Sequence, residues 1–198
     1  MPSLVDSIKE LESDLAARPI RIAAHSDMPF AIFIYPPFEE FVLRKQLRLL
    51  AITLNQNHGR QVKFVSLASI VWETIHQFDE NDLFKTEALR GLYAAQLHIN
   101  KLITSSDFQP AADSVLSKMV SLNPEKDVVF LVRAGGFAPY IYRTSQLLDS
   151  LHNRTLVPII LFYPGSAEAG TDLHFYDLPT KGSPGAYNYR VRIYGAKS

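Results

Sequence analysis

The sequence predicts an α/β protein, a layered fold in which helices flank a mostly parallel central sheet. Segments with the continuous apolar character of buried strands alternate along the chain with segments of helical periodicity. Residues 127–163 have the pattern strand, helix, strand, with the length that a right-handed parallel crossover requires. A chain of 198 residues, 47% of them hydrophobic, suffices for one compact domain. We therefore expect a single α/β domain over residues 1–198.

The first half of the chain supplies three expected helices and two expected strands. Apolar spacing predicts helices over residues 3–17, 38–57 and 67–76, and continuous apolar runs predict strands over 30–35 and 62–66. Ser3 has the position of an N-cap for the first helix, and Gly59 that of the C-terminal stop of the second. Four leucines at helical spacing predict the buried face of the second helix: Leu43, Leu47, Leu50 and Leu54.

The second half begins with a helical block at residues 79–123. Asp79 or Asn81 can cap a helix that reaches residue 103, and Pro110 can open another that ends near residue 122. A strand over 127–133, a helix from about 139 to 151 and a strand over 157–163 follow. Residues 164–198 are turn-rich, with short strands expected near 173–176 and 189–194.

Composition excludes several classes of protein. The 20 Lys and Arg residues balance 20 Asp and Glu residues, whereas binders of bulk nucleic acid or of membrane surfaces carry a basic excess. Without cysteine the chain has no disulfide framework, cysteine zinc site, iron–sulfur cluster or thiol nucleophile. The start lacks a signal-peptide pattern, and the longest apolar stretch, 157–163, is far shorter than the ~20 residues of a membrane span. We expect a cytoplasmic protein without a membrane partner.

The loop after the strand at 127–133 is a candidate site for an anion or a partner. Ligands of parallel α/β sheets bind beyond the carboxyl ends of the strands, and Arg133, Gly135 and Gly136 lie there, before an expected helix N-terminus. Neither G-x-x-x-x-G-K-[ST] nor G-x-G-x-x-G is present, so the architecture is nucleotide-binding-like but degenerate, without a P-loop. In the alternative interpretation the glycines form a tight turn and Arg133 pairs with a carboxylate at the sheet edge.

No motif for catalysis or metal binding is found elsewhere. Ser166 follows a strand, but G-x-S-x-G is absent, and a polar turn is the simpler interpretation. The six histidines are scattered, with no pair at the spacing of metal ligands. The sequence therefore predicts no catalytic residue, no cofactor and no metal, and a protein that is not an enzyme.

Positive charges gather locally although the total is balanced. The second helix carries three, and Arg60 and Lys63 follow it closely. Near the end, two arginines alternate with apolar residues in an expected strand. Such positions can contact an acidic partner or phosphates, or can form a solvated face in which Glu40 pairs with Arg44. The possible basic patch comprises Arg44, Lys45, Arg48, Arg190 and Arg192.

Several spaced segments carry a resemblance to a known family. They lie at residues 28–36, 43–50, 62–67, 127–135, 157–166 and 188–195, and the most specific read V-F-L-V-R-A-G and V-P-x-x-x-F-Y-P-G. In these segments and their order the chain resembles BrxB, a small component of the BREX bacteriophage-exclusion systems of bacteria. The resemblance covers roughly residues 3–195.

The resemblance implies a role in phage defence. BREX systems methylate host DNA and block replication of unmodified phage DNA, and BrxB-like proteins are encoded beside a methyltransferase, a large ATPase and PglZ, a member of the alkaline-phosphatase superfamily. The family has no established catalytic residues, so none is assigned here. The implied role is a non-enzymatic adaptor that binds PglZ and other BREX components and meets DNA only indirectly or weakly. We expect its partner surface within residues 79–123 or 137–198.

Two alternatives stay open at this point. A divergent nucleotide-binding subunit would use residues 133–137, and a DNA-contacting subunit would use the positive charges at 44–63.

Overall fold

The computed structural model describes residues 3–22, 28–78, 80–138, 141–168, 172–176 and 191–195. In chain order its elements are α1 (Leu4–Ala16), β1 (Phe30–Tyr35), the 3-10 turn η1 (Pro37–Glu39), α2 (Glu40–His58), β2 (Gln61–Ser66), α3 (Leu67–Phe78), α4 (Glu80–Thr104), α5 (Ala111–Ser117), β3 (Asp127–Val132), the 3-10 turn η2 (Ala134–Phe137), α6 (Thr144–Leu151), β4 (Ile159–Glu168), β5 (Asp172–Phe175) and β6 (Arg192–Gly195).

The chain forms two compact units. Unit 1 comprises residues 1–64, 122–132 and 156–198, and unit 2 comprises residues 65–121 and 133–155. The single domain expected from the sequence stays a prediction.

The predicted α/β class with a mostly parallel sheet is confirmed. Five parallel strands lie in the order β2-β3-β4-β1-β6, and helices flank the sheet. In the register of the central strands, Ala31 of β1 lies opposite Ile160 of β4 on one side and Arg192 of β6 on the other. The far end of β4 turns to an antiparallel partner, β5, where Gly165 pairs with Phe175. The alternation of helix and strand in the sequence therefore predicts the architecture correctly.

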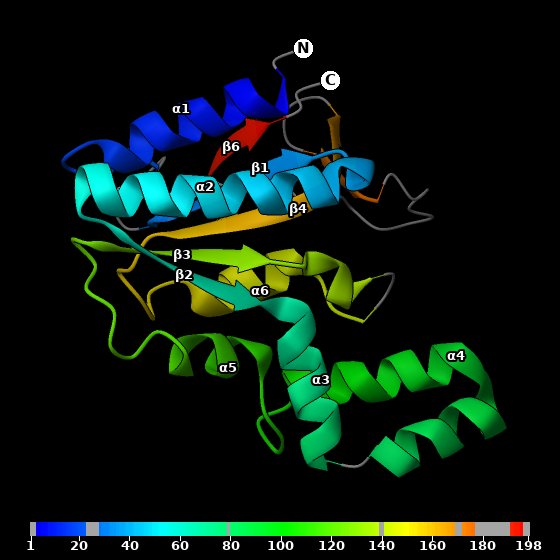
Figure 1. Cartoon of the computed structure of the whole chain (residues 1–198). Coiled ribbons are helices and arrows are strands. Elements are labelled where there is room, and N and C mark those ends of the chain that lie inside the picture. Colours follow the sequence, from blue (N-terminus) through cyan, green and yellow to red (C-terminus); the bar gives the residue numbers. More distant parts are fainter. Residues whose placement is uncertain are drawn as a thin grey trace. The chain divides into compact units, whose positions relative to one another are not determined.

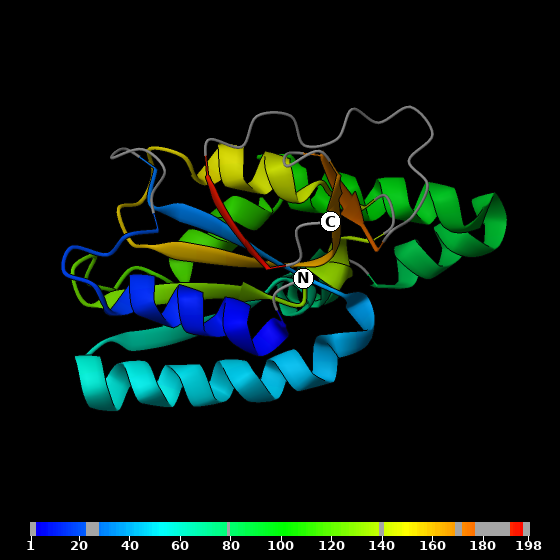
Figure 2. The same cartoon turned by 90° about the horizontal axis from the view of Figure 1, so that it is seen from above.

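Helices α1 and α2 lie side by side on one face of the sheet in unit 1 (Figures 1 and 2). Helix α1 starts at a capping box in which Ser3 and Asp6 exchange hydrogen bonds, as the N-cap pattern predicts. Helix α2 ends at Gly59, whose φ of 65° is the left-handed conformation that favours glycine at this position. Both helix boundaries expected from these two residues are confirmed.

The core of unit 1 forms where these helices meet the sheet. The four leucines predicted for the inner face of α2 are all buried, and they pack with Leu11 and Leu15 of α1. Three aromatic rings from neighbouring strands continue this core: Phe33 lies 5.3 Å and Phe130 lies 5.0 Å from Phe162, measured between ring centroids. Burial of this apolar face is the main force that holds α1 and α2 on the sheet.

Unit 2 contains α3, the helices of the predicted helical block, η2 and α6. Helix α4 is broken at Gly91, whose φ of 82° and ψ of 171° lie outside the helical region. Two arms result, residues 80–90 and 92–104, and both views show a sharp turn between them (Figures 1 and 2). The sequence predicts one helix through this point, and that expectation is wrong because glycine can adopt the left-handed φ that ends one arm.

Two further expectations from the sequence are corrected. The helix expected from about residue 139 begins only at Thr144, and the turn expected at Gly135 and Gly136 is part of a 3-10 turn over residues 134–137. Helix α5 ends at Ser117, earlier than the expected end near residue 122. The segment 189–190 of the last expected strand lies outside the described residues, and β6 covers Arg192–Gly195.

Candidate functional site

The glycine-rich loop that follows β3 is a structural turn. Because α6 begins at Thr144, the loop does not lie at the N-terminus of that helix, as the expected arrangement of helix amides requires. An anion or partner contact at Arg133, Gly135 and Gly136 stays a prediction. A Cβ atom at Gly136 would lie 2.5 Å from the Cα of Ala68 in α3, so this position requires glycine for close packing. Arg133 is exposed, with a left-handed φ of 59°, and forms no ion pair with a described residue. Gly135 and Gly136 thus match the alternative of a tight turn.

The residues of the predicted basic patch have separate roles. On α2, the Nε of Arg44 donates to the Oε1 of Glu40 at 2.7 Å, as the spacing predicts, and its guanidinium lies 5.5 Å from the ring centre of Phe41. Lys45 and Arg48 are exposed on the same helix. Arg190 lies outside the described residues. The structure therefore leaves Lys45 and Arg48 as the solvated part of this patch.

Arg192 belongs to a charge cluster between β6 and α1. Its Nη2 lies 2.7 Å from the Oδ2 of Asp14 and 3.2 Å from the Oε1 of Glu10. The hydroxyl of Tyr194 donates to the Oδ2 of Asp14 at 2.9 Å, and both of these residues are buried. Burial, followed by this hydrogen bond, raises the pKa of Tyr194 well above that of a free tyrosine. These contacts join β6 to α1, so Arg192 has a structural role.

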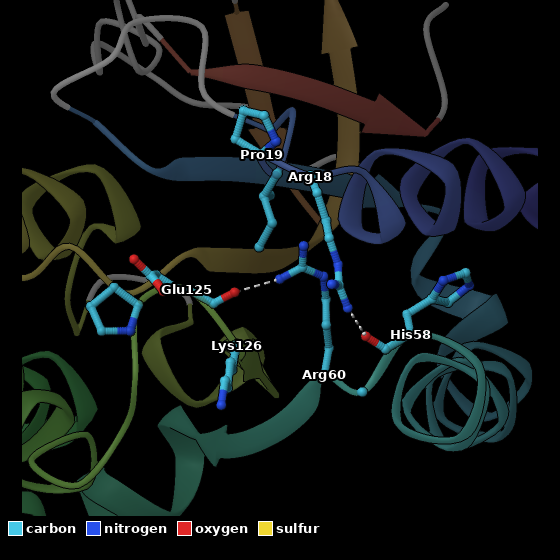
Figure 3. A pocket seen from close by; sticks show the side chains of 9 residues that line it. Arg18, Pro19, His58, Arg60, Glu125 and Lys126 are labelled. Atoms are coloured by element: carbon cyan, nitrogen blue, oxygen red, sulfur yellow. Dashed lines mark hydrogen bonds between the residues drawn. The ribbon is translucent and has the colours of Figure 1, made fainter.

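A basic cavity lies at the other edge of the sheet in unit 1, where β2 and β3 begin. It has a volume of about 500 Å³, and its basic side chains are Arg18, His58, Arg60 and Lys126 (Figure 3). Arg18 follows α1, His58 ends α2, and Arg60 and Lys126 directly precede β2 and β3. We call this space the basic cavity.

Arg60 is at the centre of the basic cavity and is only 3% exposed. Its Nη1 donates to the carbonyl of Glu125 at 2.9 Å and its Nη2 to the carbonyl of Ala17 at 2.6 Å. The Nη2 of Arg18 donates to the carbonyl of His58 at 3.2 Å. Each arginine therefore binds one carbonyl at a helix end, Ala17 for Arg60 and His58 for Arg18, where a positive charge is favourable.

Sequence reasoning missed this cavity for two reasons. It searched the carboxyl ends of the strands, whereas the cavity lies at their amino ends. Its residues also come from three distant segments, and nothing in their local patterns links them. The one available signal was Arg60, an arginine beside a helix-ending glycine and directly before a strand.

Unit 2 exposes an apolar surface on α4. Around the break at Gly91, Leu89 is 83%, Leu92 62% and Tyr93 67% exposed. Phe84 and Leu97, one on each arm, are also about half exposed. We call Leu89, Leu92 and Tyr93 the α4 tip. Adjacent exposed apolar side chains of this size are typical of protein-binding surfaces.

Unit 1 exposes a second apolar surface on the outer face of α2. It contains Phe41, Val42, Leu49 and Ile52, and Lys45 and Arg48 lie among them. The two surfaces differ in charge, since the α2 face carries these cations whereas the α4 tip itself is uncharged apart from the neighbouring Arg90.

No group of three or more potential metal ligands occurs in the described part of the chain. Among the same residues, none of the helices combines the length and the apolar character needed to cross a bilayer.

Fold and surfaces together define an α/β protein with a five-stranded parallel sheet and an exposed apolar helical turn. The family model described as BREX protein BrxB matches residues 63–193 of this chain. The chain therefore belongs to the BrxB family and is a component of a BREX antiviral defence system. No curated protein and no solved structure matches it.

Proposed function

We propose that this chain is a non-enzymatic adaptor of a BREX complex and that it binds PglZ through the α4 tip, in support of host DNA methylation and phage restriction. The exposure of Leu89, Leu92 and Tyr93 carries the proposal, because three large apolar side chains at one turn favour burial against a partner. The tip also lies within the residues that the BrxB family model matches.

The α4 tip is held in place by contacts between the two arms of the helix. Leu83 on the first arm and Ala95 on the second are buried, and the Nδ1 of His98 lies 3.5 Å from the Oγ1 of Thr86 and 4.0 Å from a carboxylate oxygen of Asp82. A tip fixed by its own arms loses little conformational entropy when a partner covers it. This preorganisation suits an adaptor surface.

The two alternatives have less support. A nucleotide-binding subunit would use the loop at residues 133–137. This loop forms a 3-10 turn in which Gly136 packs closely against Ala68, so little space is left there for a ligand. For a DNA-contacting subunit, Arg44 is paired with Glu40 and Arg60 is buried, which leaves Lys45, Arg48 and Lys63 exposed along this stretch. Because each neutralised phosphate adds to affinity, so small a set supports at most weak DNA contact.

Co-expression with PglZ, followed by size-exclusion chromatography, tests the proposed function. We expect both proteins to elute together at micromolar concentration, and the complex to persist in moderate salt because apolar contacts are weakly screened. Separate elution of the two full-length proteins at that concentration would contradict the adaptor role.

A further inference from the structure

We propose that the basic cavity binds a small molecule that carries a phosphate group. This inference concerns unit 1 alone, goes beyond the adaptor role and does not depend on it. It rests on a buried, incompletely satisfied arginine and on the charge of the residues around it.

Arg60 has hydrogen-bonding capacity that the described residues do not use. The side chain is 3% exposed, and its Nε has no hydrogen-bond partner there, although Nη1 and Nη2 both donate to carbonyls. No described carboxylate lies in ion-pair distance of its guanidinium. A buried charge without a counter-charge is costly, and the dipoles of two carbonyls offset that cost only in part. An anion in the basic cavity would supply the missing counter-charge.

The positive charge next to Arg60 also favours a bound anion. Burial, and next the positive charge of Arg18, lower the pKa of Arg60, so the two guanidinium groups repel each other at close range. Lys126 is also a lining residue, although Figure 3 shows its side chain directed away from both guanidinium groups. The carboxylate among the lining residues belongs to Glu125, and Figure 3 shows it turned away from both guanidinium groups. The two neighbouring guanidinium groups thus favour an anion in the basic cavity.

The chemistry of the lining favours a phosphate on an organic body. Arginine presents a planar fork of N–H donors that matches the oxygens of a phosphate. A volume of about 500 Å³ exceeds what one phosphate fills, and Pro19, Ile20 and Pro124 supply apolar surface for the remainder of the ligand. A phosphorylated metabolite of the size of a mononucleotide has both features.

Titration of the full chain by isothermal calorimetry and thermal shift tests the proposal. The probes are inorganic phosphate, pyrophosphate and AMP, with sodium chloride at matched ionic strength as the control for screening. We expect phosphate and AMP to raise the melting temperature in a saturable manner, because a ligand of the native state stabilises it. We also expect AMP to bind more tightly than phosphate, through the apolar lining.

Arg18→Gln combined with Lys126→Gln removes two of the charges without touching Arg60, whose bonds to the carbonyls of Ala17 and Glu125 support the fold. We expect about tenfold or more loss of affinity for each probe in this variant. Lys63→Gln is the matched control, since Lys63 is an exposed lysine on β2 outside the cavity lining, and it should bind as the unchanged chain does. Absence of saturable binding by all three probes, or equal binding by the double variant, would overturn the proposal.

Discussion

Replacement of both Leu89 and Leu92 by glutamate is expected to weaken the complex with PglZ by at least about 100-fold, because each buried leucine contributes about 1.5–3 kcal/mol and each new carboxylate would have to lose its hydration. The two side chains are 83% and 62% exposed in the chain alone, so their replacement leaves the core of unit 2 intact. Binding measured by calorimetry or surface plasmon resonance gives the change in affinity directly.

The outer face of α2 provides a matched control for this variant. Leu49 and Ile52 are 49% and 51% exposed, and their replacement by glutamate makes the same chemical change on another exposed helix. We expect that α2 variant to bind PglZ as the unchanged chain does, and both variants to keep their circular dichroism spectra and melting temperatures. If the α2 variant loses binding while the α4 variant retains it, the α4 tip is not the PglZ surface.

Asp14→Ala is expected to lower the free energy of unfolding by about 2–4 kcal/mol, because it leaves the buried hydroxyl of Tyr194 without its acceptor and removes the shorter of the two ion pairs of Arg192. Asp14 is 6% exposed and accepts from the hydroxyl of Tyr194, which is itself 1% exposed, at 2.9 Å. The Nη2 of Arg192 lies 2.7 Å from the same carboxylate. Urea unfolding monitored by circular dichroism measures the loss.

Glu10→Ala is the control for that experiment. Its carboxylate lies 3.2 Å from the Nη2 of Arg192, but its side chain is 58% exposed, so we expect a loss below about 1 kcal/mol. Equal destabilisation by both variants would contradict the assigned role of the buried Asp14–Tyr194 contact.

The same contact predicts how stability depends on alkaline pH. Burial, then the bond to Asp14, raise the pKa of Tyr194, whereas a tyrosine in the unfolded chain ionises near pH ~10. The contribution of Tyr194 is therefore complete below that pH and is lost as the pH rises above it, because only the unfolded state releases its proton there. Tyr194→Phe should reduce this alkaline loss of stability relative to the unchanged chain.

Much of the fold follows from local patterns in the sequence. The leucine spacing of α2 and the apolar run of β1 are strong signals because each buries a whole face, and the structure has both where the sequence predicts them. The start of α6 at Thr144 could not be predicted in this way. The glycines at 135 and 136 favour a turn, but the close approach of Gly136 to Ala68 depends on residues far apart in the chain.

The candidate sites were less accessible to sequence reasoning than the fold. The sequence predicts a partner surface within residues 79–123 or 137–198, but the break at Gly91 that creates the α4 tip depends on one residue's backbone conformation. The basic cavity was missed because Arg18, Arg60 and Lys126 come together only when β2 and β3 pair in the sheet. Charge counts along the chain treat Arg60 as a surface cation, whereas the structure buries it.

Hydrogen–deuterium exchange of the full chain, free and mixed with full-length PglZ, tests the adaptor role most directly, because it reports both whether the two proteins bind and where. We predict that PglZ slows exchange in peptides from α4, above all around residues 89–93, while peptides from α2 exchange at the same rate in both samples. Unchanged exchange along the whole chain at saturating PglZ would contradict the proposal that this BrxB-family protein binds PglZ.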